Sequence, residues 1–190
     1  QIVVSTGAKH SIMNVMHAMV NPGDEVIIPA PYWVSYNDMV KFVAGAPVYI
    51  KTTIQDDFKI SAAQLEQAIT AKTKIFIFSS PSNPTGSIYS KEELAALAEV
   101  FARNPHVYVI SDEIYEHINY IGAHHSIAQF EAIKDRVITI NGLSKGFAMT
   151  GWRLGYLAAH PDIAFACEKI QGQFTSGANA MTQKAAVTAL

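Results

Sequence analysis

The feature that most constrains this chain is a regular alternation of short apolar runs with segments of helical periodicity. The apolar runs are short enough for strands and cover residues 2–4, 26–29, 47–51, 75–78, 107–110, 137–140 and 154–158. The run at 75–78 has no polar face, as expected when helices cover both sides of a parallel sheet. The alternation predicts an α/β domain, a three-layer sandwich with a mostly parallel sheet between helices.

Local signals indicate where several helices begin. Ser61 with Gln64, and Ser90 with Glu93, have the spacing of a capping box ahead of apolar residues at helical spacing. Pro161 suits the first turn of a last pair of helices, where its missing N–H costs nothing. A further helix is predicted over residues 32–44.

Composition and charge exclude several classes of protein. With 49% hydrophobic and 16% charged residues, the chain can bury enough apolar surface to fold. A formal charge of −2 gives no basic surface for nucleic acid or an anionic membrane. No apolar run approaches the about 20 residues of a spanning helix. The single cysteine, Cys167, is expected in the core, and its isolation favours a reducing compartment such as the cytoplasm.

Polar clusters follow three of the predicted strands directly. They cover residues 79–86, 111–115 and 141–145, and they carry Asn83, Asp112, Tyr115, Ser144 and Lys145. Ligands of open α/β sheets bind beyond the carboxyl ends of the strands. We therefore expect these side chains to converge on one edge of the sheet and form a site.

The start of the first helix points to the same edge. Residues 5–9 read Ser-Thr-Gly-Ala-Lys, and a helix N-terminus presents free N–H groups and a positive dipole end to an anion. An ordinary N-cap by Ser5 or Thr6 is the alternative. Neither glycine-rich motif of a dinucleotide site or a P-loop is present, which argues against a nicotinamide-dependent dehydrogenase.

Taken in order, these segments resemble fold-type I enzymes that depend on pyridoxal 5'-phosphate (PLP), above all class I aspartate aminotransferases. The segments are 5–9, Pro-Tyr-Trp-Val-Ser-Tyr at 31–36, Asn-Pro-Thr-Gly at 83–86, Ser-Asp-Glu-Ile-Tyr at 111–115, and 144–156. Chains of that family are longer. The resemblance therefore implies that residues 1–190 are the PLP-binding large domain, incomplete, with the amino-terminal arm and the C-terminal small domain absent from this chain.

The resemblance implies roles for the residues around the cofactor ring. Lys145 would form the Schiff base with PLP, and Asp112 would pair with the pyridine nitrogen and keep it protonated. Asn83 and Tyr115 would donate hydrogen bonds to the 3' oxygen of the ring. Trp33 would stack on the ring face. The alternatives are a plain turn at 83–86 and a core position for Trp33.

The resemblance also implies how the phosphate of PLP would be held. Ser144, Arg153 and the backbone N–H groups of Ala8 and Lys9 would bind it, and a guanidinium fork suits a phosphate better than an ammonium does. No metal site is expected, because the histidines have neither a cysteine partner nor the H-E-x-x-H spacing.

The expected activity is that of an aminotransferase that moves an amino group between aspartate and a 2-oxo acid, in a homodimer. Two alternatives stay open. One is another fold-type I enzyme, a carbon–sulfur lyase or an aminocyclopropane-carboxylate synthase. The other is a non-catalytic PLP-binding module of a transcription regulator. Product analysis separates the first, and a winged helix elsewhere in the gene would favour the second.

Overall fold

In the computed structural model, which describes all of residues 1–190, seven strands form one sheet. The strands are β1 (Ile2–Ser5), β2 (Glu25–Ala30), β3 (Ala46–Lys51), β4 (Thr73–Ser79), β5 (Tyr108–Asp112), β6 (Val137–Gly142) and β7 (Gly155–Ala158). Their order is β1-β7-β6-β5-β4-β2-β3. Strands β2 to β6 pair in parallel, and β7 is antiparallel to both β6 and β1. The predicted mostly parallel sheet is confirmed.

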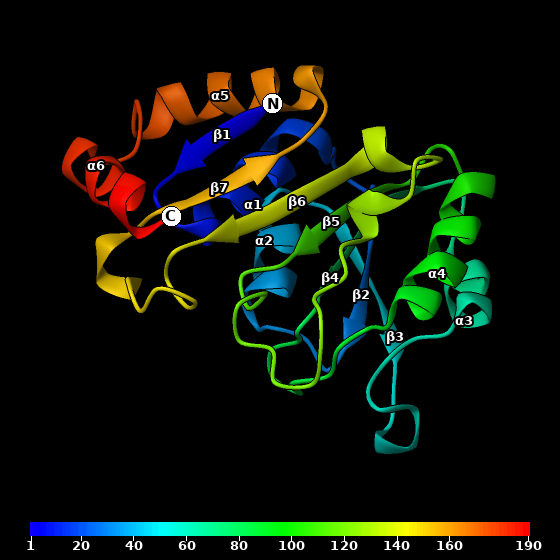
Figure 1. The fold of residues 1–190 in the computed structure, drawn as a ribbon. Coiled ribbons are helices and arrows are strands. Elements are labelled where there is room, and N and C mark those ends of the chain that lie inside the picture. Colours follow the sequence, from blue (N-terminus) through cyan, green and yellow to red (C-terminus); the bar gives the residue numbers. More distant parts are fainter.

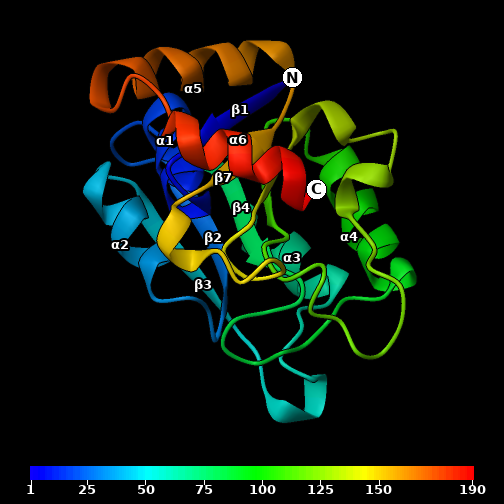
Figure 2. The same cartoon turned by 60° about the vertical axis from the view of Figure 1, so that its left-hand side comes forward.

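Helices cover both faces of this sheet. They are α1 (Ala8–Met19), α2 (Ser35–Phe42), α3 (Ala62–Ala68), α4 (Lys91–Arg103), α5 (Pro161–Phe174) and α6 (Ala180–Ala189). Helices α1, α2 and α5 pack on one face, and α3 and α4 pack on the other, which gives the predicted three layers (Figures 1 and 2). None of the helices combines the length and the apolar character needed to cross a membrane.

The interior strand β4 shows why its sequence lacks a polar face. Ile75 and Ile77 are buried in the core under α1, α2 and α5. Phe76 and Phe78 alternate with them and are buried in the core under α3 and α4. Cys167 is buried in the first of these cores, as predicted. Alternation along one strand thus supplies two cores at once.

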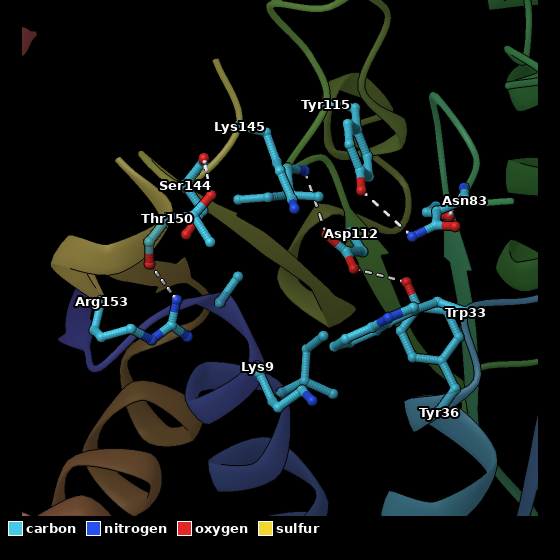
Figure 3. Close-up of a pocket in the computed structure, with 14 residues that line it drawn as sticks. Lys9, Trp33, Tyr36, Asn83, Asp112, Tyr115, Ser144, Lys145, Thr150 and Arg153 are labelled. Atoms are coloured by element: carbon cyan, nitrogen blue, oxygen red, sulfur yellow. Dashed lines mark hydrogen bonds between the residues drawn. The ribbon is translucent and has the colours of Figure 1, made fainter. Parts of the chain in front are cut away.

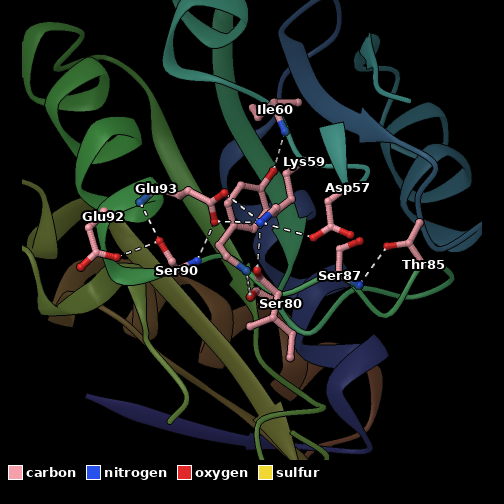
Figure 4. Close-up of polar contacts among 11 residues, drawn as sticks. Asp57, Lys59, Ile60, Ser80, Thr85, Ser87, Ser90, Glu92 and Glu93 are labelled. Atoms are coloured by element: carbon pink, nitrogen blue, oxygen red, sulfur yellow. Dashed lines mark hydrogen bonds and ion pairs between the residues drawn. The ribbon is translucent and has the colours of Figure 1, made fainter. Parts of the chain in front are cut away.

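Both predicted capping boxes form. The Ser61 hydroxyl accepts from the Gln64 N–H at 3.2 Å, and the Gln64 side chain accepts from the Ser61 N–H at 2.8 Å. At the start of α4, Ser90 and Glu93 make the same exchange. Lys59 also reaches Glu93, which ties the loop before α3 to α4 (Figure 4). Two otherwise unpaired helix N–H groups are satisfied at each site.

The helix predicted over residues 32–44 is shorter in the structure than predicted: α2 spans only Ser35–Phe42. At its start, the Tyr32 ring turns away to stack on the Tyr49 ring, with centroids 5.5 Å apart. At its end, Ala44 adopts the left-handed conformation, with φ 59°. The Gly45 N–H then bonds to the Val40 carbonyl and closes the helix.

Candidate functional site

The carboxyl ends of β4, β5 and β6 lie side by side and open into one pocket. In the strand register, Ser79 pairs with Asp112, and Asp112 pairs with Ile140. The pocket has a volume of about 180 Å³ (Figure 3). It contains all nine residues singled out from the sequence, namely Ala8, Lys9, Trp33, Asn83, Asp112, Tyr115, Ser144, Lys145 and Arg153. The expected convergence at one sheet edge is confirmed.

Asp112 forms the floor of the pocket and is only 4% exposed. The Tyr36 hydroxyl donates to its Oδ2 at 2.7 Å, and the Ile114 N–H donates to its Oδ1 at 3.3 Å. Burial raises the pKa of Asp112 to about 6, although the two hydrogen bonds act in the opposite direction. Burial also raises the pKa of Tyr36 far above its ordinary value, so Tyr36 stays a neutral donor. A cationic N–H group would find a matching partner in Asp112.

Asn83 and Tyr115 come from different loops and meet at one side of the pocket. The Asn83 side-chain amide donates to the Tyr115 hydroxyl at 3.3 Å. The Asn83 backbone N–H donates to the Ser79 hydroxyl at 3.3 Å, which anchors the turn at 83–86 to the end of β4. An amide and a phenol that converge in this way can both donate to a ligand oxygen.

Two exposed lysines line the pocket. Lys145 is exposed, and its Nζ is 5.9 Å from the centre of the Tyr115 ring. Lys9 is exposed too, with its Nζ 4.9 Å from the centre of the Trp33 ring. The Trp33 ring meets Tyr36 edge-on, with centroids 5.5 Å apart, and lines the pocket. A primary amine and an aromatic wall are therefore within reach of a bound ligand.

The start of α1 is uncapped. Gly7 is the N-cap residue, with φ 88°, and no side chain bonds to the first-turn N–H groups. The alternative of an ordinary N-cap by Ser5 or Thr6 is therefore wrong. The first turn contains no acidic residue. Because the N–H groups of Ala8 and Lys9 have no acceptor within the helix, they remain available to an anion.

Two glycines let other groups approach this helix start. A Cβ at Gly7 would lie 2.4 Å from Nη2 of Arg153, and a Cβ at Gly155 would lie 2.2 Å from the Ala8 nitrogen. The exposed guanidinium of Arg153 and the start of β7 therefore pack against the start of α1 only because side chains are absent there. Ser144, which is 9% exposed, lies on the same side of the pocket (Figure 3). Together these groups form an anion cradle, defined here as Ser144, Arg153 and the N–H groups of Ala8 and Lys9.

The sequence reasoning missed three polar residues that line the pocket, namely Tyr36, Ser79 and Thr150. Tyr36 follows Trp33 by three positions, and that spacing on a helical turn was the available signal. Ser79 directly follows the predicted strand at 75–78 and opens the polar cluster at 79–86, which was the available signal. For Thr150, no local pattern indicated a role.

A separate polar cluster lies beside the pocket, around Glu113. One carboxylate oxygen of Glu113 accepts from Ser111 at 2.8 Å and from Ser126 at 2.6 Å, and the other contacts His124 at 2.9 Å. The hydrogen bond with Glu113 raises the pKa of His124, against the effect of burial. Glu113, Glu116 and His124 carry potential metal-ligand atoms that lie within 4.8 Å of one another. Both oxygens of Glu113 are already engaged by the protein, so the cluster acts as an internal brace for the loop before Ser126.

Sequence comparison finds close relatives of this chain. The family model described as aminotransferase class I and II matches residues 1–190. A bifunctional aspartate aminotransferase and glutamate/aspartate-prephenate aminotransferase of Petunia hybrida is 53% identical, over 100% of this chain and 40% of its own length. A probable aspartate/prephenate aminotransferase of Rhizobium leguminosarum bv. phaseoli is 50% identical, over 100% of this chain and 48% of its own length.

Solved structures agree with the sequence comparison. The aspartate aminotransferase of Rhizobium meliloti superposes with a TM-score of 0.97 at 44% identity, over 99% of this chain and 48% of its own. The aspartate aminotransferase of Thermus thermophilus with maleate has a TM-score of 0.95 at 39% identity, with the same coverage. The chain spans about half the length of the relatives that it matches, or somewhat less.

Proposed function

The chain belongs to the aminotransferase class I and II family, and we propose that the whole protein is a PLP-dependent enzyme that transfers an amino group between aspartate and a 2-oxo acid. One observation carries this proposal. A single pocket brings together an accessible lysine, a buried carboxylate and an uncapped helix N-terminus beside an arginine. These are the three kinds of group that an aldehyde, a protonated pyridine ring and a phosphate require.

The anion cradle fits the phosphate of PLP. It combines unpaired helix N–H groups, the cation of Arg153 and the hydroxyl of Ser144. The glycines at 7 and 155 keep this space free of side chains. The first turn of α1 contains no acidic residue, so no negative charge there would repel the phosphate.

The opposite side of the pocket fits the ring. Asp112 would hold the pyridine N–H, Asn83 and Tyr115 would donate to the 3' oxygen, and Trp33 would cover one face. Because a neighbouring positive charge favours the ionised form of a carboxyl group, a bound ring N–H would keep Asp112 charged at neutral pH despite its burial.

When bound, PLP supplies an aldehyde that combines with amines and a protonated ring that withdraws electrons from the substrate Cα. Lys145 lines the pocket and is exposed, so its amine is accessible to a substrate. Its Nζ would take the proton from the Cα of the amino acid and deliver it to the C4' carbon of PLP, so one side chain acts as general base and then as general acid. The oxo-acid product leaves before the second oxo acid binds, which is a ping-pong order.

The proposed substrate rests on the relatives. Those from Petunia hybrida and Rhizobium leguminosarum are named for aspartate, and the Thermus thermophilus structure contains maleate, a dicarboxylate. We also propose a cytoplasmic homodimer. Exposed apolar side chains at Phe42, Phe174 and Met181 support the association, and the lone buried Cys167 suits a reducing compartment.

Labelling and product analysis of the intact protein test the function. Borohydride reduction in the presence of PLP is expected to leave the label on Lys145. Lys145→Ala should abolish the label, whereas Lys9→Ala should keep it with weaker cofactor retention. Aspartate and 2-oxoglutarate should yield oxaloacetate and glutamate. Label on another lysine would overturn the site. Release of sulfide or a cyclised product, or no turnover of any amino acid, would favour the lyase, synthase or regulator alternatives.

A further inference from the structure

The loop between β6 and β7 carries both side chains of the anion cradle, and Thr150 joins them. The Thr150 hydroxyl donates to the backbone carbonyl of Ser144 at 2.7 Å. Its own carbonyl accepts from Nη1 of Arg153, also at 2.7 Å. Figure 3 shows the chain of contacts from Ser144 through Thr150 to Arg153 on one side of the pocket. Thr150 therefore contacts both ends of the loop.

The two ends need this support for different reasons. Arg153 is exposed and has the left-handed backbone conformation, with φ 53° and ψ 56°, which a non-glycine residue adopts at a cost of about 1 kcal/mol or more. The long arginine side chain has many rotamers in solvent, and the Thr150 carbonyl selects one that faces Gly7. Ser144 is buried, and the hydroxyl of Thr150 satisfies its carbonyl in a loop that has no strand partner there.

We propose that Thr150 is a positioning residue whose hydroxyl, by holding the Ser144 carbonyl, keeps the loop that carries Ser144 and Arg153 in place for a phosphate group, and that it thereby sets the affinity of the pocket for phosphorylated ligands. This inference rests on the proposed function, because it takes PLP as the ligand. Thr150 acts on one side of the pocket only. Asp112, Asn83 and Tyr115, which would contact the ring, make no hydrogen bond with it.

A comparison of PLP with pyridoxal, which lacks the phosphate, isolates this role. Thr150→Val keeps the branched shape of the side chain and removes the hydroxyl donor, and Thr150→Ser keeps the hydroxyl. Cofactor-free intact protein would be titrated with each compound and followed by its absorbance. Thr150→Val is expected to weaken PLP binding about tenfold, the worth of one well-placed hydrogen bond. Pyridoxal affinity should stay within about twofold of wild type, and Thr150→Ser should restore PLP affinity.

The outcomes separate this inference from the proposed function. Wild-type protein that binds neither compound would refute the proposed function itself. Wild-type protein that binds PLP while Thr150→Val binds it equally well would refute only the role of Thr150. Equal losses for PLP and pyridoxal would also refute that role, because they would indicate general damage to the pocket. An unchanged unfolding midpoint of Thr150→Val, with the label still on Lys145, would show that the variant is folded.

Discussion

At the scale of single residues, Asp112 is a carboxylate that is almost fully buried. Burial raises its pKa from 3.8 to about 6 in the cofactor-free protein. The stability that this raised pKa contributes is therefore complete below about pH 4 and is lost as the pH rises through 6. We predict that Asp112→Asn stabilises the cofactor-free protein by up to about 3 kcal/mol above pH 7. The gain should shrink towards pH 4.

Urea unfolding of both proteins between pH 4.5 and 8 measures this difference. The same variant should bind PLP more weakly, because an amide cannot balance the charge of the ring N–H. A stability difference that does not change with pH would show that Asp112 is not the titrating group.

A second single-residue prediction concerns Tyr36, whose hydroxyl stabilises the charged form of Asp112. Tyr36→Phe should raise the pKa of Asp112 further. The affinity for PLP depends on an ionised Asp112 and falls as the pH is lowered. In Tyr36→Phe this fall should begin at a pH about one unit higher than in wild type. Spectroscopic titration across pH 5 to 8 is the measurement. Tyr120→Phe, at a side chain that is 90% exposed, is the matched control and should leave the profile unchanged.

At the scale of elements, the start of α4 depends on one carboxylate. Glu93 accepts from the Ser90 N–H at 2.7 Å and pairs with Lys59 at 2.8 Å. Burial lowers the pKa of Lys59, but its contacts with Glu93 and Asp57 raise it overall. Tyr89 adds a further link, because its hydroxyl accepts from the Ile60 N–H at 2.9 Å.

We predict that Glu93→Ala lowers the free energy of unfolding by about 1–2 kcal/mol, since it removes both the cap and the ion pair. Glu99→Ala, at an exposed position of the same helix, should change it by less than about 0.5 kcal/mol. Denaturant midpoints measure both. Equal effects of the two substitutions would mean that the capping network contributes nothing beyond helix propensity.

At the scale of the whole molecule, binding and turnover should separate. Residues 1–190 contain the proposed cofactor contacts but span about half of the relatives' length. We predict that this chain, expressed alone, binds PLP through Lys145 and transaminates about a hundredfold more slowly than the intact protein, or slower still. Orienting the substrate and excluding water require parts that the family resemblance places outside it. Single-turnover kinetics with aspartate would test this, and full activity of the isolated chain would contradict it.

The features that could be predicted from the sequence are those decided within a few residues. Ser61 and Ser90 cap their helices with partners three positions away, and the apolar run at 75–78 is buried whichever strands flank it. The polar clusters after three strands predicted the pocket, because parallel strands bring their carboxyl ends to one edge. Local chemistry and strand direction were sufficient for these conclusions.

Only the tertiary structure decided which distant groups touch. Tyr36 and Asp112 are 76 positions apart in the sequence. They meet because α2 packs on one face of the sheet and directs the Tyr36 hydroxyl to the end of β5. The close approach of β7 to the start of α1 at Gly155 is a second such contact, and β7 itself runs antiparallel to its neighbours. Such contacts depend on how layers pack and on where a loop such as the one around Thr150 returns. The spacing of residues within one element indicates which face of it is buried, but not which distant element packs there.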